Sequence, residues 1–295
     1  MSKKLFFLWL ILIIVFGVHL DSLSQRVLRM EAELKALRSI PTLLFSVESK
    51  TAALQNILSH EAFSKRRSVH VFRSAQNIDE LEDALISNAP HQADYNWGAG
   101  LKIGAGYDGQ GNIYRTLIRF NELKKAIPGG TQIMAATVYL KQHDNGSKDD
   151  HALMETFNLL EVEKKWGEGN KTGSHAEPGE VTWNAAAWDI LNWRIPGCSA
   201  RGADADTDTI LATTGANIND AGDGWVAFSF TPAGIARLDQ RIHNNNESDY
   251  GFLIKLADEE LKKKNTFVSF HSSNDERPSN RPYIEIIYID LGNPA

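Results

Sequence analysis

Basic and aromatic side chains occupy one side of three predicted strands. Arg115 and Arg119 alternate with apolar residues, and so do Tyr139, Lys141 and Lys255. Because successive side chains of a strand point to opposite faces, these five residues are predicted to face outward. If the strands are neighbours, the face suits a polysaccharide that carries carboxylate or sulfate groups. The alternative is an ordinary solvated face with cross-strand salt bridges.

Tryptophan supplies a second set of candidate sugar-binding residues, because its indole face packs on the C–H surfaces of a sugar ring. Trp188 and Trp193 lie in a stretch that reads as a loop or short helix, and we expect them to be exposed. Trp183 and Trp225 lie in strand-like runs, where a large aromatic side chain more often fills the core.

Alternating carboxylates give a candidate cation site. Asp204, Asp206 and Asp208 follow one another in a predicted loop, and oxygen ligands at this density suit Ca²⁺. The EF-hand pattern is not met, because Thr209 stands where it requires glycine and Gly215 where it requires the closing glutamate. The alternative is an exposed acidic loop without a metal.

No arrangement of residues predicts catalysis. Glu161, Glu163 and Glu168 lie near Trp166, as in a glycosidase cleft, but acidic residues at such spacing are common. The histidines show no metal-binding spacing such as His-Glu-x-x-His. The sequence therefore favours a binding protein over an enzyme.

The elements that must position these residues are mainly strands. Short apolar alternations separated by Gly, Asn, Asp and Pro predict an all-β domain, an antiparallel β-sandwich of jelly-roll type, over residues 68–295. Helices are expected over Asn77 to Leu85, from a capping-box spacing, and after Thr231-Pro232, where an N-cap precedes proline.

A series of short motifs in this domain resembles the DNRLRE family, which has a β-sandwich of the carbohydrate-binding-module type. The motifs occur in the family's order: Tyr95-Asn96-Trp97-Gly98, Arg115 to Phe120, Pro128 to Ile133, Ala136 to Leu140, Trp166 to Gly169, Val181 to Asn184, Asp249 to Phe252, Phe270 to Ser273, and Arg281 to Glu285. The resemblance covers roughly 69–289 and implies glycan binding. The helix-like 77–85 and a long 188–220 depart from it.

The N-terminus predicts export. Lys3 and Lys4 precede an apolar run from Leu5 to Val18, and residues 1–20 read as a signal anchor or a signal peptide. Cleavage before Gln25 would release a secreted protein, whereas an uncleaved segment would anchor the chain in the membrane, facing outside.

Residues 21–67 form a predicted helical stalk. Apolar residues recur at steps of four and three, which is typical of a short coiled coil and predicts a homo-oligomer. These residues are Leu23, Val27, Met30, Leu34 and Leu37, and, after Pro41, Leu44, Val47, Thr51, Leu54 and Leu58. A single amphipathic helix that packs on the domain or the membrane surface fits the same spacing.

Charge and cysteine content narrow the choice of partner. The net charge of −6 argues against nucleic acid, which needs a concentrated basic face. Cys198 is the sole cysteine, so the chain has no internal disulfide. The sequence predicts a non-catalytic cell-surface protein that binds polysaccharide. The alternatives are a structural or adhesive envelope protein that binds other proteins, and a glycan-cleaving enzyme.

Overall fold

A computed structural model describes residues 68–74, 78–143, 155–214, 224–244, 248–259 and 266–291. The predicted anchor over 1–20 and the predicted stalk over 21–67 lie outside these ranges. Among the residues that are described, no helix is long and apolar enough to cross a membrane.

The described chain is mostly antiparallel β-structure, as the alternation predicted. The strands are β1 (Val69–Arg73), β2 (Leu81–Ser87), β3 (Tyr95–Asn96), β4 (Lys102–Tyr107), β5 (Ile113–Phe120), β6 (Thr131–Lys141), β7 (Phe157–Val162), β8 (Ser174–His175), β9 (Ala185–Ala187), β10 (Leu191–Asn192), β11 (Ala205–Asp206), β12 (Ala212–Thr214), β13 (Trp225–Phe230), β14 (Phe252–Leu256), β15 (Val268–His271) and β16 (Tyr283–Asp290). The helices are η2 (Ile78–Glu80), α4 (Leu123–Ala126), α5 (Pro232–His243) and η5 (Pro278–Asn280).

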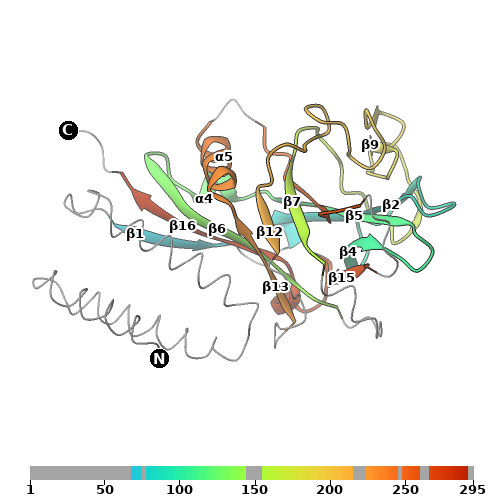
Figure 1. Cartoon of the computed structure of the whole chain (residues 1–295), viewed down its shortest axis with the longest axis horizontal. Coiled ribbons are helices and arrows are strands. Elements are labelled where there is room, and N and C mark those ends of the chain that lie inside the picture. The colour runs from blue at the N-terminus through green and yellow to red at the C-terminus, as the bar shows by residue number, and fades with distance from the viewer. Residues whose placement is uncertain are drawn as a thin grey trace, which may run out of the picture.

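One large sheet dominates the structure and curls on itself (Figure 1). Its strands follow the order β1-β16-β6-β13-β12-β7-β14-β5-β4-β15, with β2 beside β5 and β11 beside β7. Strand β15, at the end of this order, returns to β6, because Phe270 of β15 forms an isolated bridge with Gln142, directly after β6. The backbone N–H of His143 also donates to Ser269, at 2.9 Å. The strands from β6 to β15 therefore surround a common interior.

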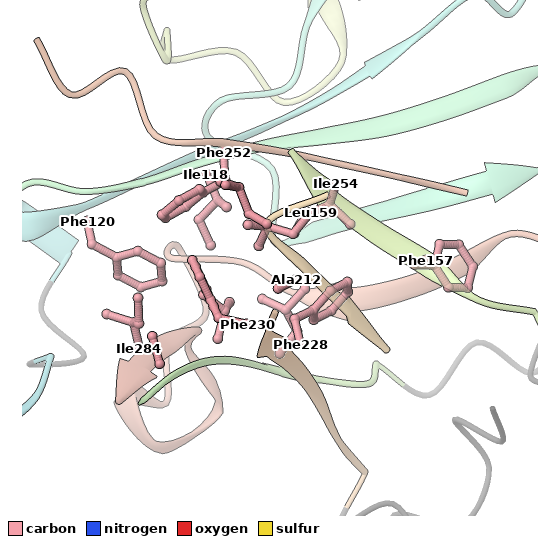
Figure 2. Close-up of a cluster of buried hydrophobic side chains, with 14 of the residues drawn as sticks. Ile118, Phe120, Phe157, Leu159, Ala212, Phe228, Phe230, Phe252, Ile254 and Ile284 are labelled. Carbon is pink, nitrogen blue, oxygen red and sulfur yellow. The ribbon is translucent and has the colours of Figure 1, made fainter. Parts of the chain in front are cut away.

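The interior of the curl is the main hydrophobic core (Figure 2). Aromatic side chains from distant strands meet there: Phe252 of β14 contacts Phe120 of β5 and Phe230 of β13, with ring centroids 6.5 and 5.9 Å apart. Val138, Phe228 and the other inward residues of these strands are fully buried. Each strand thus turns one apolar side inward, which fixes its register.

A second core lies on the outer face of β2, β5, β14 and β7. Leu117 and Leu253 point outward from β5 and β14, yet both are buried. The irregular segment from 163 to 205, which we call the covering segment, packs on them with Trp166, Trp183 and Trp193. Trp183 is 8% exposed, so its predicted core position is confirmed. The outer face of this half of the sheet is therefore a protein layer and not a solvent surface.

The two helix predictions in the domain have opposite outcomes. Helix α5 begins as predicted, because the Thr231 side chain accepts the backbone N–H of Gly234 and Pro232 takes the first turn. The helix predicted from Asn77 to Leu85 is wrong: only η2 is helical, and Leu81–Ser87 is strand β2. Pairing with β5 along the whole length of β2 outweighs the local capping signal.

The Asn96 side chain joins two loops that are distant in sequence. Its amide group donates to the carbonyls of Glu168, at 2.6 Å, and Val181, at 2.9 Å. Its oxygen accepts the backbone N–H groups of Gly98 and Lys171, both at 3.1 Å. Glycine is required at 98, because a Cβ there would lie 2.1 Å from the Glu168 carbonyl oxygen.

We expect Asn96→Ala to lower the free energy of unfolding by about 2–3 kcal/mol, because it leaves buried backbone groups without partners. Urea denaturation of the variant against the parent measures the change. Asn170→Ala, at an exposed position of the same loop, is the control. A loss for Asn96→Ala no larger than that of the control contradicts the prediction.

Candidate functional site

Arg115 and Lys255, two of the predicted ligand-binding residues, meet at one carboxylate. Arg115 donates from Nε and Nη2 to the two oxygens of Glu259, at 2.9 and 2.6 Å, and Lys255 Nζ lies 2.8 Å from Oε2. Burial alone raises the pKa of Glu259, but the hydrogen bonds and charges of Arg115 and Lys255 outweigh it and lower that pKa. One carboxylate therefore pairs with both cations and offsets one of their two positive charges.

The prediction that Arg115 faces solvent is wrong. Only 6% of the residue is exposed, and its guanidinium also donates to the Gly197 carbonyl and the Ser199 hydroxyl and lies 4.9 Å from the Trp183 ring. The covering segment that places these partners is far away in sequence. The missed signal was Leu117, an apolar residue on the same side of β5 as Arg115.

Arg119 lies at the edge of the covering segment, away from Glu259. Its guanidinium forms an ion pair with Glu82 of the neighbouring strand β2 and lies 5.0 Å from the Trp166 ring. The side chain is only 15% exposed. Arg115, Arg119 and Lys255 thus form ion pairs within the protein and not a free basic face, and the pair of Arg119 with Glu82 is the cross-strand salt bridge that the alternative expected.

Tyr139 and Lys141 lie on a different part of the sheet from the arginines. Strand β6 is separated from β5 by β13, β12, β7 and β14, so the predicted strands do not form one continuous face. Tyr139 is 4% exposed, which contradicts the expected solvent exposure, whereas Lys141 is partly exposed. These two residues nevertheless belong to a group that the sequence did not predict.

That group is the aromatic cluster, which we define as Tyr139, Trp225 and Tyr283. It stands on the outer side of β6, β13 and β16, which are adjacent in the sheet. The Tyr139 and Tyr283 rings stack with centroids 4.7 Å apart and an interplanar angle of 16°. Trp225 meets Tyr283 at 5.1 Å and 72°. Trp225 is half-buried on the outer face, so its predicted place in the core is wrong.

Two cations border the aromatic cluster. The Arg73 guanidinium of β1 lies 3.7 Å from the Tyr283 ring centroid, and Lys141 Nζ lies 5.9 Å from that of Trp225. Arg73 and Tyr139 therefore approach the Tyr283 ring, which leaves the partly exposed Trp225 indole as the stacking surface for a ligand. Pairing of β1 with β16 brings Arg73 here from the far end of the domain sequence.

Polar residues of the loop before β16 continue the site beyond Lys141. Lys141 Nζ donates to Asn280, at 2.9 Å, and Asn280 donates to Asp275, at 3.2 Å. Asp275 lies 2.5 Å from Nδ1 of His271. Burial alone raises the pKa of Asp275, but hydrogen bonds from the Arg277 N–H and His271 outweigh it. The pKa is therefore lowered, and the carboxylate stays charged. This network holds the Lys141 ammonium in position beside Trp225.

The two loop tryptophans lie in different environments. Trp188 is half-buried and meets His175 edge-on, with ring centroids 5.1 Å apart. Trp193 is 4% exposed and donates from Nε1 to the Thr182 carbonyl, so its predicted exposure is wrong. Both belong to the covering segment, whereas the aromatic cluster stands on β6, β13 and β16.

Asp204, Asp206 and Asp208 do not gather around a common point. Asp204 is fully buried and accepts from the backbone N–H groups of Arg194, Ile195 and Ala200 and from Lys164 Nζ. Asp206 accepts two N–H groups of its own turn, and Asp208 forms an ion pair with Arg201. Within the described ranges no group of three or more His, Cys, Asp or Glu residues could hold a metal ion.

The glutamates near Trp166 are also divided among separate environments. Glu161 is buried and bonded to Arg237, at 2.6 and 3.0 Å, while Glu163 is exposed. Glu168 is half-buried and accepts the backbone N–H of Asp83, at 2.8 Å. Asp83 itself is fully buried. Within the described ranges these glutamates do not form the facing pair of accessible carboxylates that glycoside cleavage needs.

Asp83 and Glu168 form the most perturbed acidic pair that the structure describes. Burial is the main cause that raises the pKa of Asp83 to about 7 and that of Glu168 to about 8. The negative charges of Asp83 and Glu82 raise the pKa of Glu168 further, and Arg119 opposes them. The pair is therefore positioned to hold protons at neutral pH.

Comparison with known proteins adds no functional assignment. Neither the models of known protein families nor the curated proteins give a match to the chain.

Proposed function

We propose that the protein binds polysaccharide at the aromatic cluster, without catalysis. The observation that carries the proposal is a partly exposed tryptophan, Trp225, braced by Tyr283 and bordered by Lys141 on one face of adjacent strands. A braced aromatic ring loses little conformational freedom when a ligand packs on it, so more of the contact energy remains as affinity.

The family resemblance and the proposed N-terminal segments are consistent with glycan binding. The short motifs in the domain resemble the DNRLRE family, and the curled antiparallel sheet is compatible with a jelly-roll sandwich of that type. A signal anchor or signal peptide over 1–20 would place the domain outside the cell, on a stalk that assembles as a homo-oligomer or packs as a single helix. Polymeric glycans of the cell surface are the ligands available there.

Trp225→Ala is expected to weaken binding of a polysaccharide about tenfold or more, because a central aromatic contact is worth at least about 1.4 kcal/mol. Isothermal titration calorimetry with the full-length protein in detergent measures the affinity. Thermal denaturation checks that the variant is folded, because the indole is half-buried against Tyr283 and its removal costs some stability.

Trp188→Ala is the matched control, since Trp188 is also half-buried but lies in the covering segment. An affinity that falls for Trp188→Ala and not for Trp225→Ala would move the binding site to that segment. Binding that neither substitution changes, or no binding to any glycan on an array, would reject the proposed function and favour a structural or adhesive protein.

A further inference from the structure

The cations beside the aromatic cluster differ from most others that the structure describes. Arg115, Arg119, Lys164, Lys171, Arg201, Arg237, Arg241 and Lys255 each lie within ion-pair distance of a carboxylate. Lys141 instead contacts the neutral amide of Asn280 and the Trp225 ring, and Arg73 contacts the Tyr283 ring. Among the described residues neither lies within ion-pair distance of a carboxylate, so both can offer their charge to a ligand.

We infer that the site selects an anionic polysaccharide, through Lys141 and Arg73, with carboxylate or sulfate groups as the anions. The inference rests on the proposed function and adds the class of ligand. A ring that packs on Trp225 lies beside Lys141, whose ammonium is held by Asn280. Arg73 can offer its planar guanidinium to a second anion.

The placement of the two cations favours a polymer over a single sugar. Arg73 is opposite Glu285, Glu285 is opposite Thr137, and Lys141 is four residues further along β6 than Thr137. Strand spacing and rise place the Cα atoms of Arg73 and Lys141 about 16 Å apart. Both charged groups lean toward the aromatic cluster, so they are closer together than their Cα atoms. We expect a polymer, which can meet both cations at once along the cluster, to bind better than a single sugar.

The charges around the site are unequal at its two ends. Glu285 lies directly opposite Arg73 and is half-buried, so its negative charge offsets part of the Arg73 field. At the other end Asn280 lies between Lys141 and Asp275, and Asp275 is hydrogen-bonded to His271. We therefore expect Lys141 to contribute more than Arg73 to the affinity for an anionic chain.

Matched pairs of ligands test the inference by calorimetry on the full-length protein in detergent. Polygalacturonate against its methyl ester tests carboxylate, and dextran sulfate against dextran tests sulfate. We expect at least one anionic member to bind about tenfold or more tighter than its neutral partner at low salt, and this preference to shrink as salt is added. A longer oligogalacturonate should bind tighter than a digalacturonate.

Substitutions assign the preference to the named cations. Lys141→Gln should lower the affinity for the anionic ligand about three- to tenfold, with a smaller loss for Arg73→Gln, and each substitution should weaken the neutral ligand less than the anionic one. Lys141→Arg should restore most of the affinity. Lys165→Gln, at an exposed position of the covering segment, is the control and should have no effect. Thermal denaturation checks that each variant is folded.

The outcomes separate the inference from the proposed function. Equal binding of the charged and neutral members, still weakened by Trp225→Ala, overturns the anionic selectivity and keeps the binding site. A charge preference that Lys141→Gln and Arg73→Gln leave unchanged also overturns the inference. No binding of either pair, and none of any glycan, rejects the proposed function itself.

Discussion

Replacing Arg115 with alanine is expected to lower the free energy of unfolding by about 3–5 kcal/mol, the usual cost of breaking a buried ion pair. The guanidinium is almost completely buried and donates two hydrogen bonds to Glu259. Its removal leaves Glu259, which is 10% exposed, with Lys255 as its cation. The pKa of Glu259 should then rise, because the strongest opposing interaction is lost.

Two comparisons show whether burial causes the loss. Arg119→Ala removes an arginine of the same strand whose ion pair with Glu82 is less buried, and we expect a smaller loss than for Arg115→Ala. Arg115→Met combined with Glu259→Leu and Lys255→Met removes all three charges of the site and should recover much of the loss. Urea denaturation near pH 7 measures all three. A loss for Arg115→Ala as small as that for Arg119→Ala would contradict the expected role of Arg115.

Features set by neighbouring residues could be predicted from the sequence. The start of α5 follows from the Thr231 side chain and Pro232, which act within one turn. Strands β5, β6, β13 and β14 follow from alternation, because each has one face in the main core. Strand β2 could not be predicted from alternation, because it is buried on both faces. Its residues, including Asp83, show no alternation of burial.

Features set by distant residues could not be predicted. Alternation correctly put Arg115 and Lys255 on the outer side of β5 and β14, but it could not show that residues 163–205 cover that side. Leu117 and Leu253, on the same side, were the available signal. The aromatic cluster needs the pairing of β1 with β16 and of β16 with β6, which joins Arg73, Tyr283 and Tyr139 across most of the domain.

The buried acidic pair should make the protein less stable as the pH rises from about 4 to about 8. The folded pKa of Asp83, about 7, and of Glu168, about 8, exceed the ordinary values of 3.8 and 4.5. In this window the folded state binds protons that the unfolded state releases. Stability is therefore complete below the unfolded pKa values and is lost as the pH rises through the folded ones.

The local structure explains why the charged forms are costly. Asp83 is fully buried; its Oδ2 accepts the Ser273 N–H, at 2.6 Å, while Oδ1 has no hydrogen-bond partner. Glu168 accepts the Asp83 N–H, and Glu82 and Arg119 are the other charged groups that act on it. A shift of about three pKa units corresponds to roughly 4 kcal/mol for one group, and coupling within the pair makes the combined effect less than the sum.

Asp83→Asn and Glu168→Gln keep the acceptor oxygens and remove the titration. We expect each variant to be more stable than the parent at pH 8.5, by on the order of 2 kcal/mol, and to differ little at pH 5. Urea denaturation across this range measures both values, with Glu177→Gln, an exposed carboxylate, as the control. Variants that stay parallel to the parent at every pH would show that Asp83 and Glu168 ionise normally in the folded protein.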